Sequence, residues 1–192
     1  RALSSLGLST VPILLSLIKD TTIHNTCRIL AARILGRLSS PQLHANLLTI
    51  VNAEIDRTYT FFYHAHTIQK SHPQYDLSLL AKALLSGCYS SLDFVLQLLS
   101  ITGYLDDSEL ISRSLQNKSI KIQGRAVETL EKTCDPKIFQ RLLPLIENVP
   151  TEEKVAHCIK KSVPSLTLIE ILDRLEKSSS PLKKITAATL KA

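Results

Sequence analysis

Apolar residues recur along the chain at intervals of three and four, the spacing that places side chains on one face of an α-helix. The longest such pattern runs from Pro41 to about Lys70 and includes Leu43, Leu47, Ile50, Val51, Ile55, Tyr59, Phe62 and Ala65. At 1.5 Å per residue, it predicts a helix roughly 45 Å long. A second long apolar pattern follows from Leu77 to about Thr102. We expect these two helices to form an antiparallel pair.

Proline residues divide the rest of the chain into shorter helices. Ser40-Pro41, Asp135-Pro136 and Ser180-Pro181 each place a capping side chain before a proline at the first helical position. Thr151 is followed by two glutamates, which suit the positive end of a helix dipole. Together these signals predict about nine helices joined by short loops, because an alternating strand pattern is found nowhere in the sequence.

One short motif recurs in the segments predicted to be second helices of hairpins. It consists of an apolar residue, two or three variable residues, an alanine, and a leucine four residues after the alanine. Copies lie at 27–38, at 122–130 and, with Thr186 in place of the alanine, at 182–190, and the tail of another lies at 2–7. Alanine at a helix crossing lets two backbones approach, and leucine one turn later fills the seam. Hairpins of this kind bury their apolar faces by stacking on one another.

The first complete copy resembles the HEAT-repeat family, which has an aspartate, an arginine, an alanine and a leucine–glycine pair at the positions of Asp20, Arg28, Ala31, Leu35 and Gly36. The resemblance is strongest over residues 1–38, continues over 108–147 and is weakest over 151–192. It implies an α-α superhelix of helical hairpins, in which Ala31 and Ala126 lie buried at helix crossings. The spacing from Asp20 to Arg28 is wider than in the family, so the resemblance does not carry over a direct pairing of these two residues.

The predicted fold is therefore all-α: an α-α superhelix of HEAT-like helical hairpins with an inserted long antiparallel helix pair. We expect a single helical-repeat domain over 1–192, with repeats at 1–38, the long hairpin at 41–103 and further repeats at 108–192. The composition agrees, because only five glycines are present and aliphatic residues greatly outnumber the aromatic ones. Since the chain starts at Arg1 without an initiator, we expect it to be a piece of a longer protein.

A narrower resemblance covers about residues 54–147. It consists of the motif Glu54-x-x-Arg57-x-Tyr59, a turn containing proline, and apolar segments at 95–99, 111–115, 126–130 and 142–147. This order is similar to the helical-repeat region that follows the membrane domain in some bacterial ATP/ADP-translocase-like transporters. In some members a cyclic-nucleotide-binding domain comes next. The resemblance implies a cytoplasmic module that couples or regulates a transporter. We therefore expect a non-catalytic scaffold that binds protein partners or neighbouring domains of the same chain.

Sequence motifs for catalysis, metal binding and cofactor binding are missing. His64 and His66 point about 200° apart on a helix and therefore cannot share a metal ion. We expect His64 to be exposed and His66 to pack at the helix seam. His157-Cys158 are sequence neighbours on different helix faces, so they do not form a nucleophile and its base. The four cysteines form no C-x-x-C pair, and five scattered glycines form no phosphate loop. We therefore expect a protein that is not an enzyme and has no metal ion or cofactor.

The net charge of +6 is concentrated in the last part of the chain. Residues 118–192 hold fourteen lysines and arginines against nine acidic residues. The candidate surface for an anionic partner consists of Lys118, Lys121, Arg125, Lys160, Lys161, Lys183 and Lys184. Such a surface is typical of contact with nucleic acid or an anionic membrane. Solvated helix faces also explain these charges, and aromatic residues for stacking on bases are nearly missing there. Nucleic-acid binding is therefore the alternative to a protein scaffold.

The location expected from sequence is cytoplasmic, either free or on the cytosolic face of a membrane protein. No signal peptide is visible at the start of the chain. The most apolar stretch, 79–105, is interrupted by Lys82, Asp93 and Gln97 and therefore does not read as a membrane span. We expect any link to a membrane to run through a region upstream of Arg1.

Overall fold

The structure is a computed structural model that describes residues 7–177 of the chain. These residues form a 3₁₀ turn and nine α-helices and contain no strand: η2 (Gly7–Thr10), α1 (Val11–Lys19), α2 (Asn25–Leu38), α3 (Ser40–Ser71), α4 (Ser78–Ile101), α5 (Ser108–Leu115), α6 (Ile120–Thr133), α7 (Pro136–Ile146), α8 (Thr151–Lys160) and α9 (Leu168–Glu176). The predicted all-α class is confirmed for this part of the chain.

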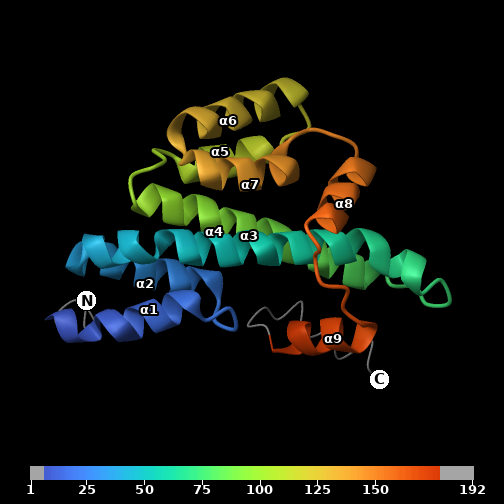
Figure 1. The fold of residues 1–192 in the computed structure, drawn as a ribbon, viewed down its shortest axis with the longest axis horizontal. Coiled ribbons are helices and arrows are strands. Elements are labelled where there is room, and N and C mark those ends of the chain that lie inside the picture. Colours follow the sequence, from blue (N-terminus) through green and yellow to red (C-terminus); the bar gives the residue numbers. More distant parts are fainter. Residues whose placement is uncertain (1–6, 178–192) are drawn as a thin grey trace.

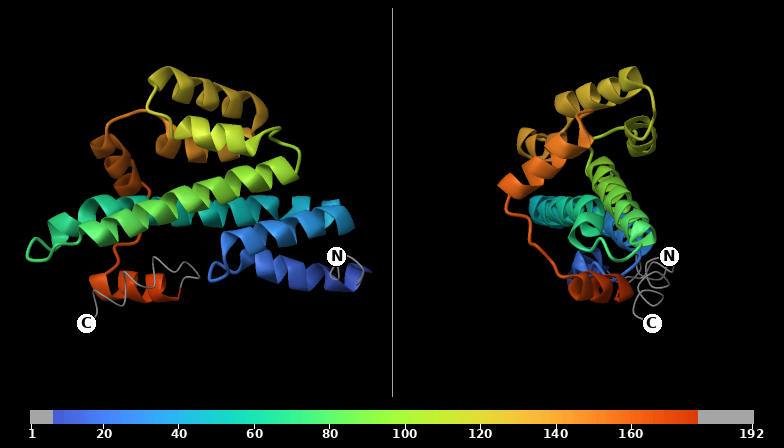
Figure 2. Two further views of the ribbon diagram at one scale, coloured as in Figure 1. Left: turned by 180° about the vertical axis from the view of Figure 1, so that it is seen from behind. Right: turned by 90° about the vertical axis from the view of Figure 1, so that its right-hand side faces the viewer.

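The two longest helices, α3 and α4, form the centre of the molecule (Figure 1). They run antiparallel and make the most extensive helix–helix packing in the structure, as their apolar patterns predict. The α1–α2 hairpin covers one side of this pair, and α5, α6 and α7 cover the opposite side. Helices α8 and α9 lie beside the C-terminal half of α3, as the left view of Figure 2 shows. The long pair therefore acts as a frame on which the shorter helices are placed.

Helix α4 is long and apolar enough to cross a membrane by length and composition, and it is the one described helix that meets this test. In the structure it is a core helix, because 56% of its most apolar window is buried. It packs along α3 and also contacts α2 and α5. Its apolar composition is explained by these contacts.

Local capping chemistry sets several helix ends. Asp135 accepts hydrogen bonds from the backbone N–H groups of Lys137 and Ile138 and starts α7, as the sequence predicts. The expected cap at Ser40 is wrong, because α3 begins at Ser40 itself and its flanking residue makes no side-chain cap. Helix α4 ends at Ile101, and Gly103, whose φ is +81°, permits the hydrogen bonds that close the helix. Ser180-Pro181 lies outside the described residues.

Buried side chains form two clusters. The larger joins α1 to α7 and reaches Cys158 of α8. The smaller lies at the far end of the long pair, where Leu80 and Leu84 of α4 pack with Ile171 and Leu175 of α9. Ala31 and Ala126, the two alanines of the repeat motif, are 4% and 3% exposed, so the prediction that they are buried is confirmed.

A buried ion pair joins the first hairpin to the central helices. The guanidinium of Arg28 pairs with the carboxylate of Glu54, and both side chains are 1% exposed. Arg28 Nε also donates to the carbonyl of Ile18 over 2.8 Å, and its guanidinium lies 4.0 Å from the centre of the Phe94 ring. Asp20 instead accepts from Thr22. The partner of Arg28 is thus Glu54 of α3, and this cluster links α1, α2, α3 and α4.

Candidate anion-binding cleft

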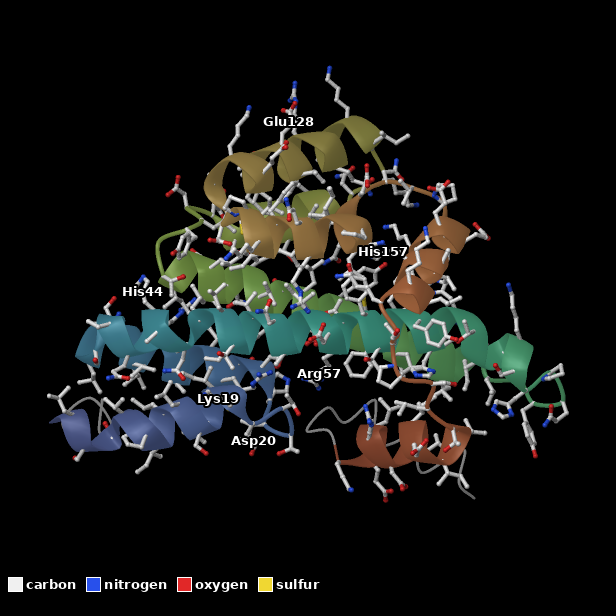
Figure 3. All side chains as sticks on the ribbon, in the orientation of Figure 1. Lys19, Asp20, His44, Arg57, Glu128 and His157 are labelled. Carbon is white, nitrogen blue, oxygen red and sulfur yellow. The ribbon has the colours of Figure 1, made fainter. Side chains whose placement is uncertain are left out.

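A cavity of about 950 Å³ lies between the middle of α3, the α1–α2 turn, the loop after α8, and α9. In Figure 3, Arg57 lies on the side of α3 that faces this region, near the turn that carries Asp20. We call the cavity the α3–α9 cleft. Leu84 of α4 and Arg141 of α7 also line it, so six parts of the chain come together there.

The inner surface of the cleft is mostly apolar. Its apolar lining residues are Tyr59, Phe61, Leu84, Val163, Pro164, Leu166, Ile171 and Leu175. Hydroxyl groups are supplied by Thr21, Thr22, Thr60 and Ser162. Pockets of this kind, apolar with a few polar groups, are typical of ligand-binding sites.

Positive charge dominates the polar part of the lining. The cations are Arg57, Arg141, Lys161, Arg174 and Lys177. Asp56 is the one acidic residue among the described residues that line the cleft. Five positive charges against one negative charge give the lining a net charge of +4 with His64 neutral. A concave site with charges of one sign attracts ligands of the opposite sign.

Arg57 is held in place by three contacts. Its Nη1 lies 3.5 Å from Glu54 Oε2, its Nη2 donates to the carbonyl of Thr21 over 3.4 Å, and its guanidinium lies 5.1 Å from the centre of the Phe61 ring. Burial lowers the pKa of Arg57, while the charge of Glu54 acts in the opposite direction. The side chain is 22% exposed, so a held guanidinium group still presents its charge to the cleft.

A second group of side chains forms the wall between α3, α7 and α8. Arg141 pairs with Asp56, and Tyr59 Oη donates to the carbonyl of Arg141 over 2.8 Å. Lys161 Nζ lies 4.5 Å from the centre of the Tyr59 ring, and His157 stacks on the same ring with centroids 5.9 Å apart. Burial lowers the pKa of Lys161 and raises that of Tyr59. The aromatic ring is therefore already occupied by a cation and an imidazole.

His64 closes the inner end of the cleft, and the expectation that it is exposed is wrong. Its side chain is 3% exposed, and its Nε2 lies 3.0 Å from the carbonyl oxygen of Pro164. Because a carbonyl oxygen only accepts, Nε2 donates this bond, and burial lowers the pKa of His64. His66 is only half-buried, and its Nδ1 lies 2.9 Å from the carbonyl oxygen of Phe62. His64 is buried because the loop before α9 folds back over the face of α3 that carries it.

The seven basic residues predicted from sequence do not come together in one surface. Lys161 lies in the cleft, whereas Lys160 is exposed on α8 and does not line it. The other described members, Lys118, Lys121 and Arg125, are exposed at the start of α6. This helix, which also carries Glu128, lies at the edge of the molecule opposite the cleft (Figure 3). Lys183 and Lys184 lie outside the described residues.

Sequence reasoning missed four of the five cations of the cleft: Arg57, Arg141, Arg174 and Lys177. They come from α3, α7, α9 and the residue after α9, so no local spacing connects them. The single local signal was Arg57 itself, because it belongs to the motif Glu54-x-x-Arg57-x-Tyr59 that carried the narrower resemblance. A charge cluster built from distant segments becomes visible only when the helices are placed in space.

The hydroxyl of Thr60 lines the cleft and is already engaged within its own helix. Thr60 Oγ1 donates to a carbonyl of its own helix over 2.9 Å. Cys158 is fully buried, and burial raises its pKa to about 11, which removes it as a thiolate nucleophile. Within residues 7–177, no three histidine, cysteine or acidic side chains converge as metal ligands. Comparisons of this chain with models of known protein families, with curated proteins and with solved structures gave no match.

Proposed function

We propose that this chain is a non-catalytic scaffold that holds a protein partner, or a neighbouring domain of its own chain, in the α3–α9 cleft. The finer architecture that we propose is an α-α superhelix of HEAT-like hairpins, interrupted by the long α3–α4 pair. The observation that carries the proposal is the cleft itself, with its apolar lining and its five cations. An apolar surface with a few fixed charges favours tight and oriented binding of a partner.

Binding is favoured over catalysis by the state of the polar groups around the cleft. The ring nitrogen of His64 that faces Pro164 is engaged in a hydrogen bond, so it does not serve as a base for a hydroxyl group. The hydroxyl of Thr60 donates its hydrogen bond to the carbonyl of Asp56 in its own helix. A site with this chemistry recognises a shape and a charge and leaves its ligand unchanged.

The anchoring of the α3 wall of the cleft supports the same proposal. Helix α3 contacts α1, α2, α4, α7 and α8, so the wall that it contributes is anchored along most of its length. Arg57 is fixed through Glu54, which also pairs with Arg28 in the core. Binding groups that are held in place lose little conformational freedom when a partner arrives.

The transporter assignment is the narrower part of the proposal. We place the scaffold at the cytosolic face of a bacterial ATP/ADP-translocase-like transporter, as a regulatory part. Supporting it are Glu54, Arg57 and Tyr59, on which the resemblance rests, since all three hold the core or the cleft together. The test is the coding sequence upstream of Arg1. Hydrophobic spans are expected there, and their absence would eliminate the transporter version while leaving the scaffold version standing.

Site-specific photocrosslinking in the full-length protein tests the scaffold version. The crosslinking amino acid replaces Thr21, which is exposed and lines the cleft, and a matched control replaces Glu128 on α6. In the native host, the Thr21 position should give one dominant product that mass spectrometry maps to a defined segment of a partner or of another domain. The same products from both positions, or none from Thr21, would overturn the proposal.

Nucleic-acid binding is the second candidate, and the exposed basic start of α6 favours it. Lys118, Lys121 and Arg125 are all exposed there and line no part of the cleft. A salt-titrated binding assay with duplex and single-stranded probes decides this case, because contacts to phosphates weaken steeply as salt rises. A lack of affinity for both probes at low salt would eliminate it.

A further inference from the structure

The cations of the α3–α9 cleft differ in how far they are neutralised. Arg57 and Arg141 have carboxylate partners in Glu54 and Asp56. Lys161, Arg174 and Lys177 line the same cavity, and none of the three makes an ion pair with any residue that the structure describes. The cleft therefore has three positive charges that a ligand can neutralise.

The backbone around the cleft is poorly suited to a phosphate group. Phosphate sites commonly use free N–H groups at a helix N-terminus. The N-terminus of α9 is already closed by a capping box, in which the hydroxyl of Thr167 accepts from the N–H of Glu170 and the carboxylate of Glu170 accepts from the N–H of Thr167. Helix α8 presents its C-terminal end to the cleft, and the N–H of Lys161 bonds to the carbonyl of His157. Leu168 and Ile169, the first two residues of α9, do not line the cleft, so neither helix offers it an N–H cradle.

The aromatic residues are equally unsuited to stacking on a nucleic-acid base. The side chain of Tyr59 is 1% exposed, and the ammonium of Lys161 lies over its ring. The ring of Phe61 has the guanidinium of Arg57 over it. Base recognition by stacking needs an accessible ring face. The cleft instead offers aliphatic surface beside cations that can pair with carboxylates.

The size of the cleft and the composition of the chain narrow the source of those carboxylates. A cavity of about 950 Å³ is at the upper end of the range for one small ligand and has room for several side chains. Residues 178–192 of this chain carry three lysines and no acidic residue, so they contain no carboxylate side chain for these cations. The carboxylates must therefore come from another segment or another protein.

We infer that the α3–α9 cleft binds an acidic segment of the partner protein, in which glutamate or aspartate side chains alternate with aliphatic ones. This inference rests on the proposed scaffold function and specifies the chemistry of its partner. The carboxylates pair with Lys161, Arg174 and Lys177, while the aliphatic side chains pack on the partly exposed apolar lining residues Val163 and Leu166. Charge steers the segment to the cleft, and apolar burial retains it.

The test uses the full 192-residue chain and a fluorescein-labelled peptide that alternates glutamate with leucine, followed by fluorescence anisotropy. A second peptide has glutamine in place of every glutamate. The acidic peptide should bind saturably and more weakly as salt rises, and the glutamine peptide should not bind. In ¹⁵N spectra, the acidic peptide should shift the amide signals of Thr21, Ser162 and Arg174.

The decisive variant combines Arg174→Glu with Lys177→Glu, and the matched control combines Lys118→Glu with Lys121→Glu. Both doubles change the net charge equally, and all four side chains are exposed, so each chain should keep its helical circular dichroism. The cleft double should weaken the acidic peptide by at least about tenfold, and the α6 control should leave its affinity unchanged. Should the cleft double lose its fold, Lys177→Glu alone should still weaken binding, because Lys177 lies beyond the last described helical residue.

Three results would overturn the inference: equal binding of the glutamine peptide, equal loss in both double variants, or no peptide binding at all. Duplex DNA and phosphatidylserine vesicles form further arms of the test. If either binds and the acidic peptide does not, the inference is wrong. If the peptide fails while the crosslink from Thr21 still maps to a defined partner, the acidic-segment inference falls and the scaffold proposal stands. Failure of both experiments removes both.

Discussion

Replacing Glu54 with leucine tests whether the buried ion pair holds the first hairpin on the central helices. Glu54 pairs with Arg28 in the core and lies 3.5 Å from Arg57, and its own side chain is 1% exposed. Glu54→Leu therefore leaves two guanidinium groups without their carboxylate. The Arg28 charge is the costly one, because it is also 1% exposed and cannot regain water.

The size of the effect follows from that burial. Removing one partner of a buried pair typically costs about 3–5 kcal/mol of the free energy of unfolding. Arg28→Met should cost less, roughly 2–3 kcal/mol, because Glu54 keeps Arg57 as a partner while the carbonyl of Ile18 loses its donor. The double variant should recover most of the loss, since a well-packed apolar pair replaces an ion pair at little cost.

Urea unfolding of four proteins (wild type, both single variants and the double variant), monitored by circular dichroism, gives the complete double-mutant cycle. The slope with urea must stay constant for the comparison to hold. Glu54→Leu should be the least stable of the four, and the double variant should lose less stability than the sum of the two single losses. Additive losses, or a cost below about 1 kcal/mol for Glu54→Leu, would refute the view that this pair is a buried and coupled unit.

Four further predictions concern the core, the pH dependence and the thiols. Ala31→Leu should overpack the helix crossing and lower the free energy of unfolding by roughly 1–3 kcal/mol in urea titrations, and a neutral effect would contradict the crossing. Gly36→Ala should raise it by about 0.5–1 kcal/mol, because the added methyl meets only ordinary contacts at 3.5 Å. Because the pKa of His64 is lowered in the folded protein, the unfolded chain binds a proton at His64 more readily. The contribution of His64 to stability is therefore complete above the unfolded pKa of 6.5 and is lost as the pH falls through the folded pKa. Urea midpoints measured across this pH range should show the loss, and His64→Gln should make the loss smaller. Cys27 is exposed and should react at once with a thiol reagent, whereas Cys88, whose pKa burial raises to about 12, should react only after unfolding.

The long helices could be predicted from sequence because their signals are local. The pattern from Pro41 to about Lys70 corresponds to α3, Ser40–Ser71, and the pattern from Leu77 to about Thr102 corresponds to α4, Ser78–Ile101. An unbroken helical period and a proline near the start act within a few residues of chain. Such features are independent of where the other helices lie.

The burial of His64 and the partner of Arg28 could not be predicted, because distant segments decide both. The sequence pattern of α3 places His64 on an exposed face. In the fold, its ring lies against the carbonyl of Pro164, a hundred residues later in the chain. Arg28 finds its carboxylate on Glu54 of another helix and not on the nearby Asp20. Spacing rules describe which residues share a face of one helix, and they carry no information about what covers that face.

The cleft could not be predicted from sequence for the same reason. The one sequence signal that points to it is a motif of α3. Glu54 uses one carboxylate oxygen for Arg28 in the core and the other for Arg57 in the cleft. Two residues after Arg57, Tyr59 bonds to the backbone of α7 and carries Lys161 over its ring. Little more than one helical turn thus joins the buried ion pair, the first hairpin and the cations of the cleft. The side chains of this segment contact the core, the first hairpin and the cleft. The same residues therefore determine both the stability of the central helices and the charge pattern of the cleft.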